Sequence, residues 1–276
     1  MALAFSKMHG AGNDFVLVDL RGKRVPPEVA TVRAMADRHA GVGFDQLLAI
    51  TDAGRAGCVA GYRIWNSDGS SAQQCGNGAR CVAAWLVRDG MATGPRFALD
   101  SPAGPIEVEC LADGRYALDM GKPVFDPPHI PLRATHEQPR YEWRERETTL
   151  HFGAASMGNP HALVEVADVA RAPVAAQAAA LQGSGLFPQG VNVGFAQLLS
   201  REAIKLRVVE RGVGETLACG SGACAAVAVL VRQGKVGRKV DVQLPGGTLS
   251  IDWPGDAAGI RMAGPAAFVF EGEWLQ

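Results

Sequence analysis

Hydrophobic and polar residues alternate with a period of two along several stretches of this 276-residue chain. Such alternation is typical of half-buried β-strands, because successive side chains of a strand point to opposite faces of a sheet. Residues 26–39 and 173–181 instead show helical patterns, the first followed by Gly41. The expected strands are residues 15–18, 47–50, 62–65, 106–109 and 116–120 in the first half, and 162–166, 191–195, 204–209, 240–244 and 249–251 in the second.

Two further helices are expected to begin near Gly78 and Gly222, and neither has a polar face. A helix without a polar face cannot lie on a surface, so each must be wrapped by other elements. The pattern therefore predicts a mixed α/β fold, of the α+β kind. Each half is expected to be a curved sheet or barrel around one central, buried helix.

The two halves of the sequence are related by an internal repeat. A shift of 144 residues places Cys75 on Cys219 and Arg88 on Arg232. Upstream, a shift of 146 places Asn13 on Asn159, and the same shift places Gln46 on Asn192. A long repeat that occurs only twice indicates a duplicated domain rather than a solenoid.

The duplication predicts two pseudo-symmetric domains. The first is expected to span residues 1–120 and to be joined by a terminal strand within 264–276, and the second to span 121–263. The linker is placed between residues 120 and 132, where Gly121 and four prolines interrupt regular structure.

Composition and charge indicate which partners to expect. The formal net charge is −1, which offers no electrostatic reason to bind nucleic acid or an anionic membrane. The longest uncharged stretch, 216–231, is too short and too rich in glycine for a membrane span, and the first residues do not resemble a secretory signal. We therefore expect a cytoplasmic protein with a small-molecule substrate.

The six cysteines are not spaced for zinc, since no Cys-x-x-Cys pair occurs, and a chain of this length in a reducing compartment needs no disulfides. No metal site is expected. Cys58, Cys81, Cys110 and Cys224 are interpreted as small buried hydrophobic residues.

Cys75 and Cys219 differ from the other cysteines, because each stands just before a Gly-x-Gly turn that opens an apolar helix. The N–H groups and dipole of a helix N-terminus favour a thiolate, so both pKa values are expected below the free value of about 8.5. Two thiols on opposite faces of one carbon can take a proton from one face and return it to the other. The N–H groups at 76–77 and 220–221 can stabilise the charge that builds on a substrate carboxylate.

Polar residues accompany both cysteines in the same register. Asn13, Gln46 and Asn66 in the first half match Asn159, Asn192 and Glu210 in the second. Neutral amides suit recognition of a zwitterion, although Asn13 and Asn159 also lie in turn-forming sequences. His161 is a candidate to tune a cysteine, against the alternative of a structural histidine. The Glu210-Arg211 pair offers opposite charges, against the alternative of a surface ion pair.

Five segments of the chain, 7–15, 37–46, 74–81, 156–161 and 219–224, resemble the signature blocks of the diaminopimelate epimerases. The resemblance covers nearly the whole chain, and the two cysteine blocks are its most specific part. It implies a cofactor-independent epimerase that interconverts LL- and meso-2,6-diaminopimelate, on the route to lysine and peptidoglycan. It also implies two α/β domains with the active site in the cleft between them, and a homodimer.

The resemblance assigns roles by motif. It makes Cys75 and Cys219 the two catalytic acid/base groups, and His161 and Glu210 the residues that tune their pKa values. The residues that match substrate contacts of the family are Asn13, Gln46, Asn66, Gly76, Asn77, Asn159, Asn192, Glu210, Arg211, Gly220 and Ser221.

Two other readings stay open at this point. A two-thiol racemase acting on proline or hydroxyproline would use the same cysteines but would need to hold a ring nitrogen. A non-catalytic binding protein or a thiol redox protein would keep its main function after the loss of one thiol. Assays of both substrates and of single cysteine variants separate these alternatives.

Overall fold

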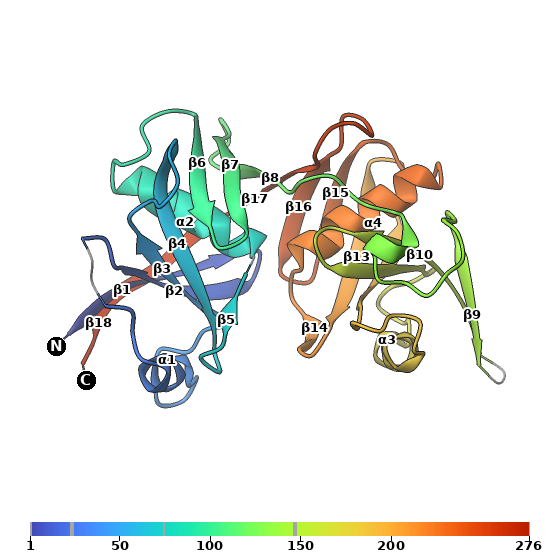
Figure 1. The fold of residues 1–276 in the computed structure, drawn as a ribbon, viewed down its shortest axis with the longest axis horizontal. Coiled ribbons are helices and arrows are strands. Elements are labelled where there is room, and N and C mark those ends of the chain that lie inside the picture. The colour runs from blue at the N-terminus through green and yellow to red at the C-terminus, as the bar shows by residue number, and fades with distance from the viewer. Residues whose placement is uncertain (1, 23–24, 74, 146–147, 276) are drawn as a thin grey trace. The chain divides into compact units, whose positions relative to one another are not determined.

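The computed structural model describes residues 2–22, 25–73, 75–145 and 148–275, so that Gln74 of the first cysteine block lies outside the described part. The chain forms two compact units. The first unit contains the chain up to Asp119 and the C-terminal segment from Ala263 onwards. The second unit comprises Met120–Met262. Figure 1 shows strands and one long helix, α2 or α4, in each unit.

The first unit is a strongly mixed sheet. Pairing runs in the order β18, β1, β2, β3, β4, β6, β7, β8, and β5 lies beside β4. The β2–β3 and β4–β6 pairs are parallel, whereas the others are antiparallel. The strands are β1 (Leu3–Gly10), β2 (Asn13–Asp19), β3 (Gln46–Thr51), β4 (Cys58–Asn66), β5 (Ser71–Ala72), β6 (Arg96–Ser101), β7 (Gly104–Cys110), β8 (Tyr116–Asp119) and β18 (Ala267–Trp274).

Two helices cover opposite faces of this sheet. The period of two in β2 directs Phe15 towards α2 (Gly76–Arg88), and the neighbouring Val16 towards α1 (Val29–Ala36). Val32 and Met35 of α1 are completely buried in the core cluster that contains Val16. The sheet is thus buried on both faces, with α2 as its central helix.

The second unit repeats this arrangement strand by strand. The parallel pairs β11–β12 and β13–β15 correspond to β2–β3 and β4–β6 of the first unit. Antiparallel pairs join β9 to β10, β10 to β11, β12 to β13, β13 to β14, and β15 to β16. The strands are β9 (Tyr141–Glu145), β10 (Thr148–Ser156), β11 (Pro160–Glu165), β12 (Asn192–Leu198), β13 (Ala203–Glu210), β14 (Gly214–Thr216), β15 (Lys239–Leu244) and β16 (Gly247–Asp252), and β17 (Arg261–Gly264) leads back to the first unit.

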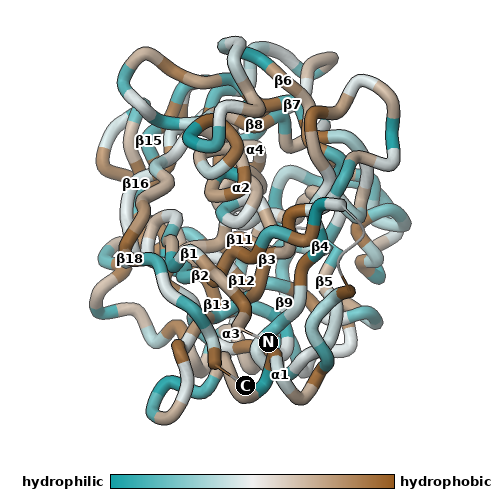
Figure 2. Tube along the Cα trace, turned by 90° about the vertical axis from the view of Figure 1, so that its left-hand side faces the viewer, coloured by the Kyte–Doolittle hydropathy of each residue, from teal (hydrophilic) through white to brown (hydrophobic). Residues whose placement is uncertain are grey.

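In this unit α4 (Gly220–Arg232) is the buried helix and α3 (Val174–Gly183) covers the other face of the sheet, while a 3-10 turn spans Pro127–His129. The residues of α4 from Gly222 to Leu230 are all buried. In Figure 2 many of the outer turns of the trace are teal, which marks hydrophilic residues. The expected mixed α/β fold with one central helix in each half is confirmed.

Some helix bounds and the burial of some cysteines differ from those predicted from the sequence. The first amphipathic helix spans Val29–Ala36 and is shorter at both ends than the expected 26–39. At its C-terminal end Asp37 accepts hydrogen bonds from the backbone N–H groups of His39 and Ala40 and so ends the helix. Cys81 and Cys224 are completely buried as expected, but Cys58 and Cys110 are only partly buried. These two lie at the ends of β4 and β7, where the sheet meets solvent. None of the helices in the described chain is long and apolar enough to cross a membrane.

Candidate active site

Cys75 and Cys219 are the N-cap residues of the two central helices. Both have extended backbones, with φ and ψ of −150° and 103° at Cys75 and of −121° and 107° at Cys219. The Sγ of Cys75 accepts a hydrogen bond from the N–H of Gly78 at 3.4 Å. Gly76 and Gly220 are the first residues of the helices, so backbone N–H groups of each first turn lie beside the thiol.

The second glycine of each Gly-x-Gly turn allows the helix to pack closely on the sheet. A Cβ at Gly78 would lie 3.1 Å from a methyl group of Leu48, and one at Gly222 would lie 3.2 Å from a methyl group of Val208. The Cys219 sulfur would be 3.3 Å from the latter Cβ. These contacts are tight for any side chain, so the glycines bring the thiols and the strand ends together.

Amide side chains surround Cys75. Asn13 Oδ1 lies 3.7 Å from Cys75 Sγ, which donates to it, and 3.5 Å from Asn77 Nδ2. Asn13 Nδ2 in turn donates to Asp45 Oδ2 at 2.6 Å. Asn77 is almost fully buried in the first turn of α2. The structure therefore brings three of the expected residues into one hydrogen-bonded group.

Gln46 and Asn66 form a second pair at the same edge of the sheet. They are register partners of β3 and β4, and Gln46 Nε2 donates to Asn66 Oδ1 at 2.9 Å. Asn66 Nδ2 donates to Ser70 Oγ at 3.0 Å. The Gln46 Oε1 atom is buried without a hydrogen-bond partner among the described residues, which leaves it as an acceptor for a ligand.

A charged cluster, formed by Lys7, Asp14, Arg38 and Asp45, holds the Asn13 side chain through the hydrogen bond from Asn13 to Asp45. Arg38 bonds both oxygens of Asp14 and one oxygen of Asp45, and Lys7 bonds Asp14 and the backbone carbonyl of Gly43. Burial would raise the pKa of Asp14, but hydrogen bonds from Arg38 and Lys7 lower it to about 2. This cluster was not predicted from the sequence, although all four of its residues lie within the first two signature blocks.

Cys219 has a different environment from Cys75. Its Sγ donates to Glu210 Oε2 at 3.2 Å and lies 3.7 Å from Ser221 Oγ, and Thr216 Oγ1 donates to Glu210 Oε1 at 2.6 Å. Burial and the negative charge of Glu210 raise the pKa of the Cys219 thiol well above its ordinary value. The expectation of a lowered pKa was therefore wrong for Cys219, because burial and the carboxylate outweigh the helix N-terminus.

His161 contacts the neighbours of Cys219, and no contact in the described chain joins it to a thiol directly. His161 Nε2 lies 3.0 Å from Asn159 Oδ1 and 3.1 Å from Ser221 Oγ, and Asn159 Nδ2 donates to the same hydroxyl at 3.4 Å. Burial, with a smaller effect of Arg211, lowers the pKa of His161 to about 3. The imidazole is therefore neutral at pH 7 and orients Asn159 and Ser221.

The neutral, buried state of His161 predicts acid sensitivity. Unfolded histidine takes up a proton below about pH 6.5 whereas native His161 does not, so the free energy of unfolding falls as pH drops from about 6.5 towards 3, by about 1.4 kcal/mol per pH unit. Between pH 6.5 and 5.0 the wild type should lose about 2 kcal/mol more than His161→Gln in urea titrations. His151→Gln, at an exposed histidine of β10, is the control. Equal losses in all three proteins would refute this expectation.

Asn192 and Arg211 complete the second group. The buried Asn192 begins β12, and its Oδ1 accepts a hydrogen bond from the backbone N–H of Arg211 at 2.8 Å. The exposed Arg211 guanidinium donates to the carbonyl of Gln189. Gly190 has a φ of +74°, which favours glycine, and a Cβ there would lie 2.5 Å from Arg211 Cδ and would displace that side chain.

The expected residues occupy equivalent places in the two units. Asn13 begins β2 and Asn159 directly precedes β11, while Gln46 and Asn192 begin the next strands, β3 and β12. Asn66 and Glu210 end the strands that follow, β4 and β13. Because β2 is parallel to β3, and β11 to β12, the residues of each set lie together at the same end of neighbouring strands. The central helix of each unit also begins at this end.

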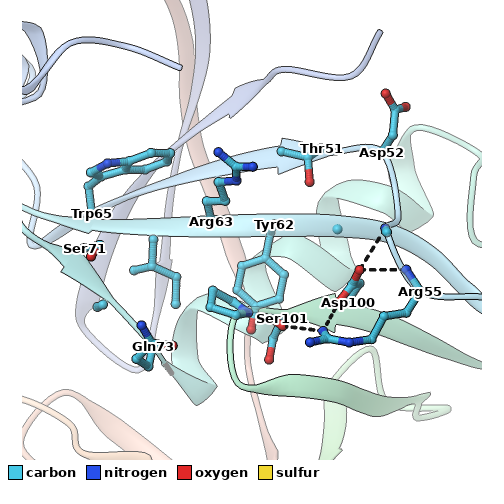
Figure 3. A pocket seen from close by; sticks show the side chains of 15 residues that line it. Thr51, Asp52, Arg55, Tyr62, Arg63, Trp65, Ser71, Gln73, Asp100 and Ser101 are labelled. Carbon is cyan, nitrogen blue, oxygen red and sulfur yellow. Dashed lines mark hydrogen bonds and ion pairs between the residues drawn. The ribbon is translucent and has the colours of Figure 1, made fainter. Parts of the chain in front are cut away.

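An open groove of the first unit lies apart from these residues. Figure 3 shows it along β4, with Trp65, Arg63 and Tyr62 on the strand and the ion pair of Arg55 with Asp100 at one end. None of the expected catalytic or substrate-binding residues lines it. Its lining includes two ion-paired groups that already satisfy each other, so the groove does not enter the account of the chemistry.

Comparisons with known proteins agree with these observations. A family model described as diaminopimelate epimerase matches residues 5–125 and 153–269. A diaminopimelate epimerase of Xanthomonas axonopodis pv. citri is 58% identical over 273 residues, which cover 99% of this chain and 96% of that protein. An O-ureido-serine racemase of Streptomyces lavendulae is 57% identical over 276 residues, with coverage of 99% and 96%.

Solved structures share the fold at low sequence identity. A hydroxyproline epimerase from Agrobacterium vitis, with bound trans-4-OH-L-proline, superposes with a TM-score of 0.70 at 16% identity and covers 99% of this chain and 92% of that one. At this identity the likeness concerns the fold alone.

Proposed function

Since the chain belongs to the diaminopimelate epimerase family and is an isomerase, we propose that it interconverts LL- and meso-2,6-diaminopimelate. The observation that carries the proposal is the pair of N-capping thiols, Cys75 and Cys219, each at the start of a buried helix and each beside a matched set of polar residues. The residues of the chain supply all acid/base groups for this reaction.

The proposed reaction uses the two thiols as a pair. One cysteine, as thiolate, takes the α-proton from one face of the substrate carbon, so that a C–H bond breaks and an S–H bond forms. The other, as thiol, delivers its proton to the opposite face, and its S–H bond is replaced by a new C–H bond. The carbon is inverted, and the protonation states of the cysteines are exchanged for the reverse reaction.

The weakly acidic α-proton requires stabilisation of the carbanion. We assign this to the N–H groups at the starts of α2 and α4, at Gly76-Asn77 and Gly220-Ser221, which would bind the carboxylate of the reacting centre. Preorganised N–H groups act most strongly where water is excluded, and the first turns of both helices are largely buried.

The remaining residues are proposed to recognise the rest of the substrate. The amides Asn13, Gln46, Asn66, Asn159 and Asn192 hold its ammonium and carboxylate groups. The exposed guanidinium of Arg211 fits the distal carboxylate of diaminopimelate. Glu210 is engaged by Cys219 and Thr216, which assigns it to the proton transfer, and His161 acts through Ser221.

Substrate choice is tested by assaying LL-diaminopimelate, O-ureido-L-serine, L-proline and trans-4-hydroxy-L-proline with one preparation. We expect turnover of diaminopimelate to exceed that of the others by at least about 10³-fold, because only this substrate pairs a distal charge with Arg211. O-ureido-serine is the informative competitor, since its ureido group is neutral and a racemase for it is 57% identical to this chain. Preference for O-ureido-serine or for proline would overturn the assignment.

We further propose that the enzyme acts in the cytoplasm as a homodimer. Strand β18 supports the dimer, since it pairs with β1 and presents three exposed apolar residues. The exposed fractions of Phe268, Val269 and Phe270 are 38%, 55% and 48%. Phe270 packs against Phe5 on one face of the sheet and Phe268 against Arg88 on the other, and both rings keep exposed apolar area that a second copy could cover.

The dimer proposal predicts that Phe268→Asp separates the subunits. Sedimentation velocity should give twice the chain mass of 29.0 kDa for the wild type and a single chain mass for the variant. The control is Leu199→Asp, at an apolar residue that is 44% exposed in the second unit. A monomeric wild type, or a dimer that persists in Phe268→Asp, would contradict the proposal.

A further inference from the structure

Arg211 is the cation of the group around Cys219, and it forms no ion pair with a carboxylate of the described chain. Its side chain is exposed, and its guanidinium donates to the backbone carbonyl of Gln189. Its charge contributes to the lowered pKa of His161, which agrees with a position near this group. Since a guanidinium carries five N–H donors, most of them stay available to an anionic ligand.

The loop that carries Gln189 is held against the core of the second unit. The N–H of Gly190 donates to the carbonyl of Phe187 at 2.9 Å, and Phe187 is buried in the core cluster. Gln182 of α3 donates through Nε2 to the carbonyl of Val191 at 3.0 Å. The carbonyl that receives the guanidinium therefore lies between two anchored residues.

Gly190 leaves the space in which the Arg211 side chain lies. A Cβ at Gly190 would lie 2.5 Å from Arg211 Cδ and 3.0 Å from its Cγ, and the third nearest atom, at 3.9 Å, is the Nε of the same residue. This side chain is exposed and can rotate, so an added Cβ would move the arginine rather than the core. The missing side chain of Gly190 thus decides where the guanidinium is placed.

The first unit has neither member of this pair. The shift of 144 residues places Arg211 on Ser67, and the shift of 146 places Gly190 on Phe44. Phe44 is almost fully buried in the loop before β3, so the shared architecture accepts a large residue there. The glycine occurs in the copy that carries the arginine, which indicates a role for Gly190 beyond the fold.

We propose that Gly190 is a positioning residue for substrate specificity, which lets the Arg211 guanidinium rest on the Gln189 carbonyl and present its other N–H groups to the distal carboxylate of the substrate. The inference rests on the proposed function, since it concerns the distal end of diaminopimelate. A planar guanidinium with one N–H already fixed is oriented before the ligand binds. Less freedom is then lost when the carboxylate pairs with it.

The first test is the kinetics of Gly190→Ala with LL-diaminopimelate. We expect KM to rise about tenfold while kcat changes by less than about twofold, because the distal carboxylate loses its partner and the thiols keep their surroundings. Gly185→Ala is the matched control. Gly185 has a φ of +72° and no atom within 4 Å of an added Cβ, so it carries the same backbone strain without the contact, and its KM should match the wild type.

A double-mutant cycle separates the arginine from the backbone. Arg211→Ala alone should raise KM at least as much as Gly190→Ala. Adding Gly190→Ala to Arg211→Ala should then raise KM by less than about twofold, because the side chain that the Cβ displaces is gone. A tenfold rise in both backgrounds would assign the effect to backbone strain and would overturn the inference.

Crystal structures without substrate test the placement of the arginine directly. In Gly190→Ala the guanidinium should leave the Gln189 carbonyl while the backbone of the loop stays in place, and an Arg211 side chain in its original position would contradict the inference. A wild-type crystal structure without the contact to Gln189 would do so even if no variant folded. Failure of the proposed function is a separate result, since the displaced arginine would then accompany a wild type that does not turn over LL-diaminopimelate.

Discussion

Replacement of either Cys75 or Cys219 by alanine is expected to lower kcat for the conversion of LL- to meso-diaminopimelate by at least about 10³-fold. A general acid or base typically contributes about 10²- to 10⁴-fold, and here each variant lacks one of the two proton-transfer groups. Both losses should be of similar size, because inversion needs removal of a proton on one face and delivery on the other. Initial rates in both directions measure the effect.

Cys58→Ala is the matched control, since Cys58 is a partly buried free thiol at the start of β4 and caps no helix. We expect it to keep the wild-type rate. Binding of diaminopimelate should persist in both catalytic variants, because the amides that recognise the substrate are retained. If one of the two alanine variants kept more than a tenth of the wild-type rate, a two-thiol mechanism would not describe this enzyme.

Glu210→Gln is expected to lower kcat by about 10²-fold with a smaller change in KM. The carboxylate accepts the Cys219 proton at 3.2 Å, and its charge is second only to burial in raising the pKa of that thiol. With glutamine, the pKa of Cys219 should fall, and the basic limb of the pH–rate profile, where Cys219 loses the proton that it donates, should move to lower pH. The variant keeps the size of the side chain and an oxygen for Thr216.

Glu215→Gln is the control for Glu210, since Glu215 lies in the neighbouring β14 and pairs with Arg207 at the surface. Its rate and pH profile should match the wild type. A Glu210→Gln enzyme with normal kcat and an unshifted profile would show that the carboxylate does not control the thiol.

The duplicated architecture could be predicted from the sequence, because two sequence patterns indicate it strongly. The apolar helices after Gly78 and Gly222 have no polar face, and the repeat aligns the two halves over many residues. The structure repeats the strand pairing in both units and begins both helices at a cysteine cap. The positions of the amides at the strand ends follow from the same repeat.

Several strands were not predicted, because packing rather than local pattern decides them. Strand β10 contains Gly153, Ala154 and Ala155, which have little preference for a strand. A Cβ at Gly153 would lie 2.2 Å from a methyl group of Val229, so the small residues make room for α4. Strand β1 likewise holds the buried Lys7, whose ammonium group is bonded by Asp14 of the next strand and by the carbonyl of Gly43.

The difference between the surroundings of Cys75 and those of Cys219 could also not be predicted from the sequence. Both cysteines have the same local motif, which predicts a lowered pKa for each. The difference comes from residues that are distant along the chain, since Glu210 reaches Cys219 from the end of β13. The charged cluster behind Asn13 likewise joins residues from β1, β2 and the loop before β3. Such groups become visible only after the strands are paired.

The central claim, that two thiols exchange protons with one carbon from opposite faces, is tested most directly in deuterated water. Wild-type enzyme is mixed with LL-diaminopimelate, and both isomers are isolated at low conversion for mass spectrometry and NMR. We predict one deuteron at the inverted α-carbon of the meso product and none in the remaining LL substrate. Equal labelling of both isomers, or a product that retains its original proton, would contradict the account.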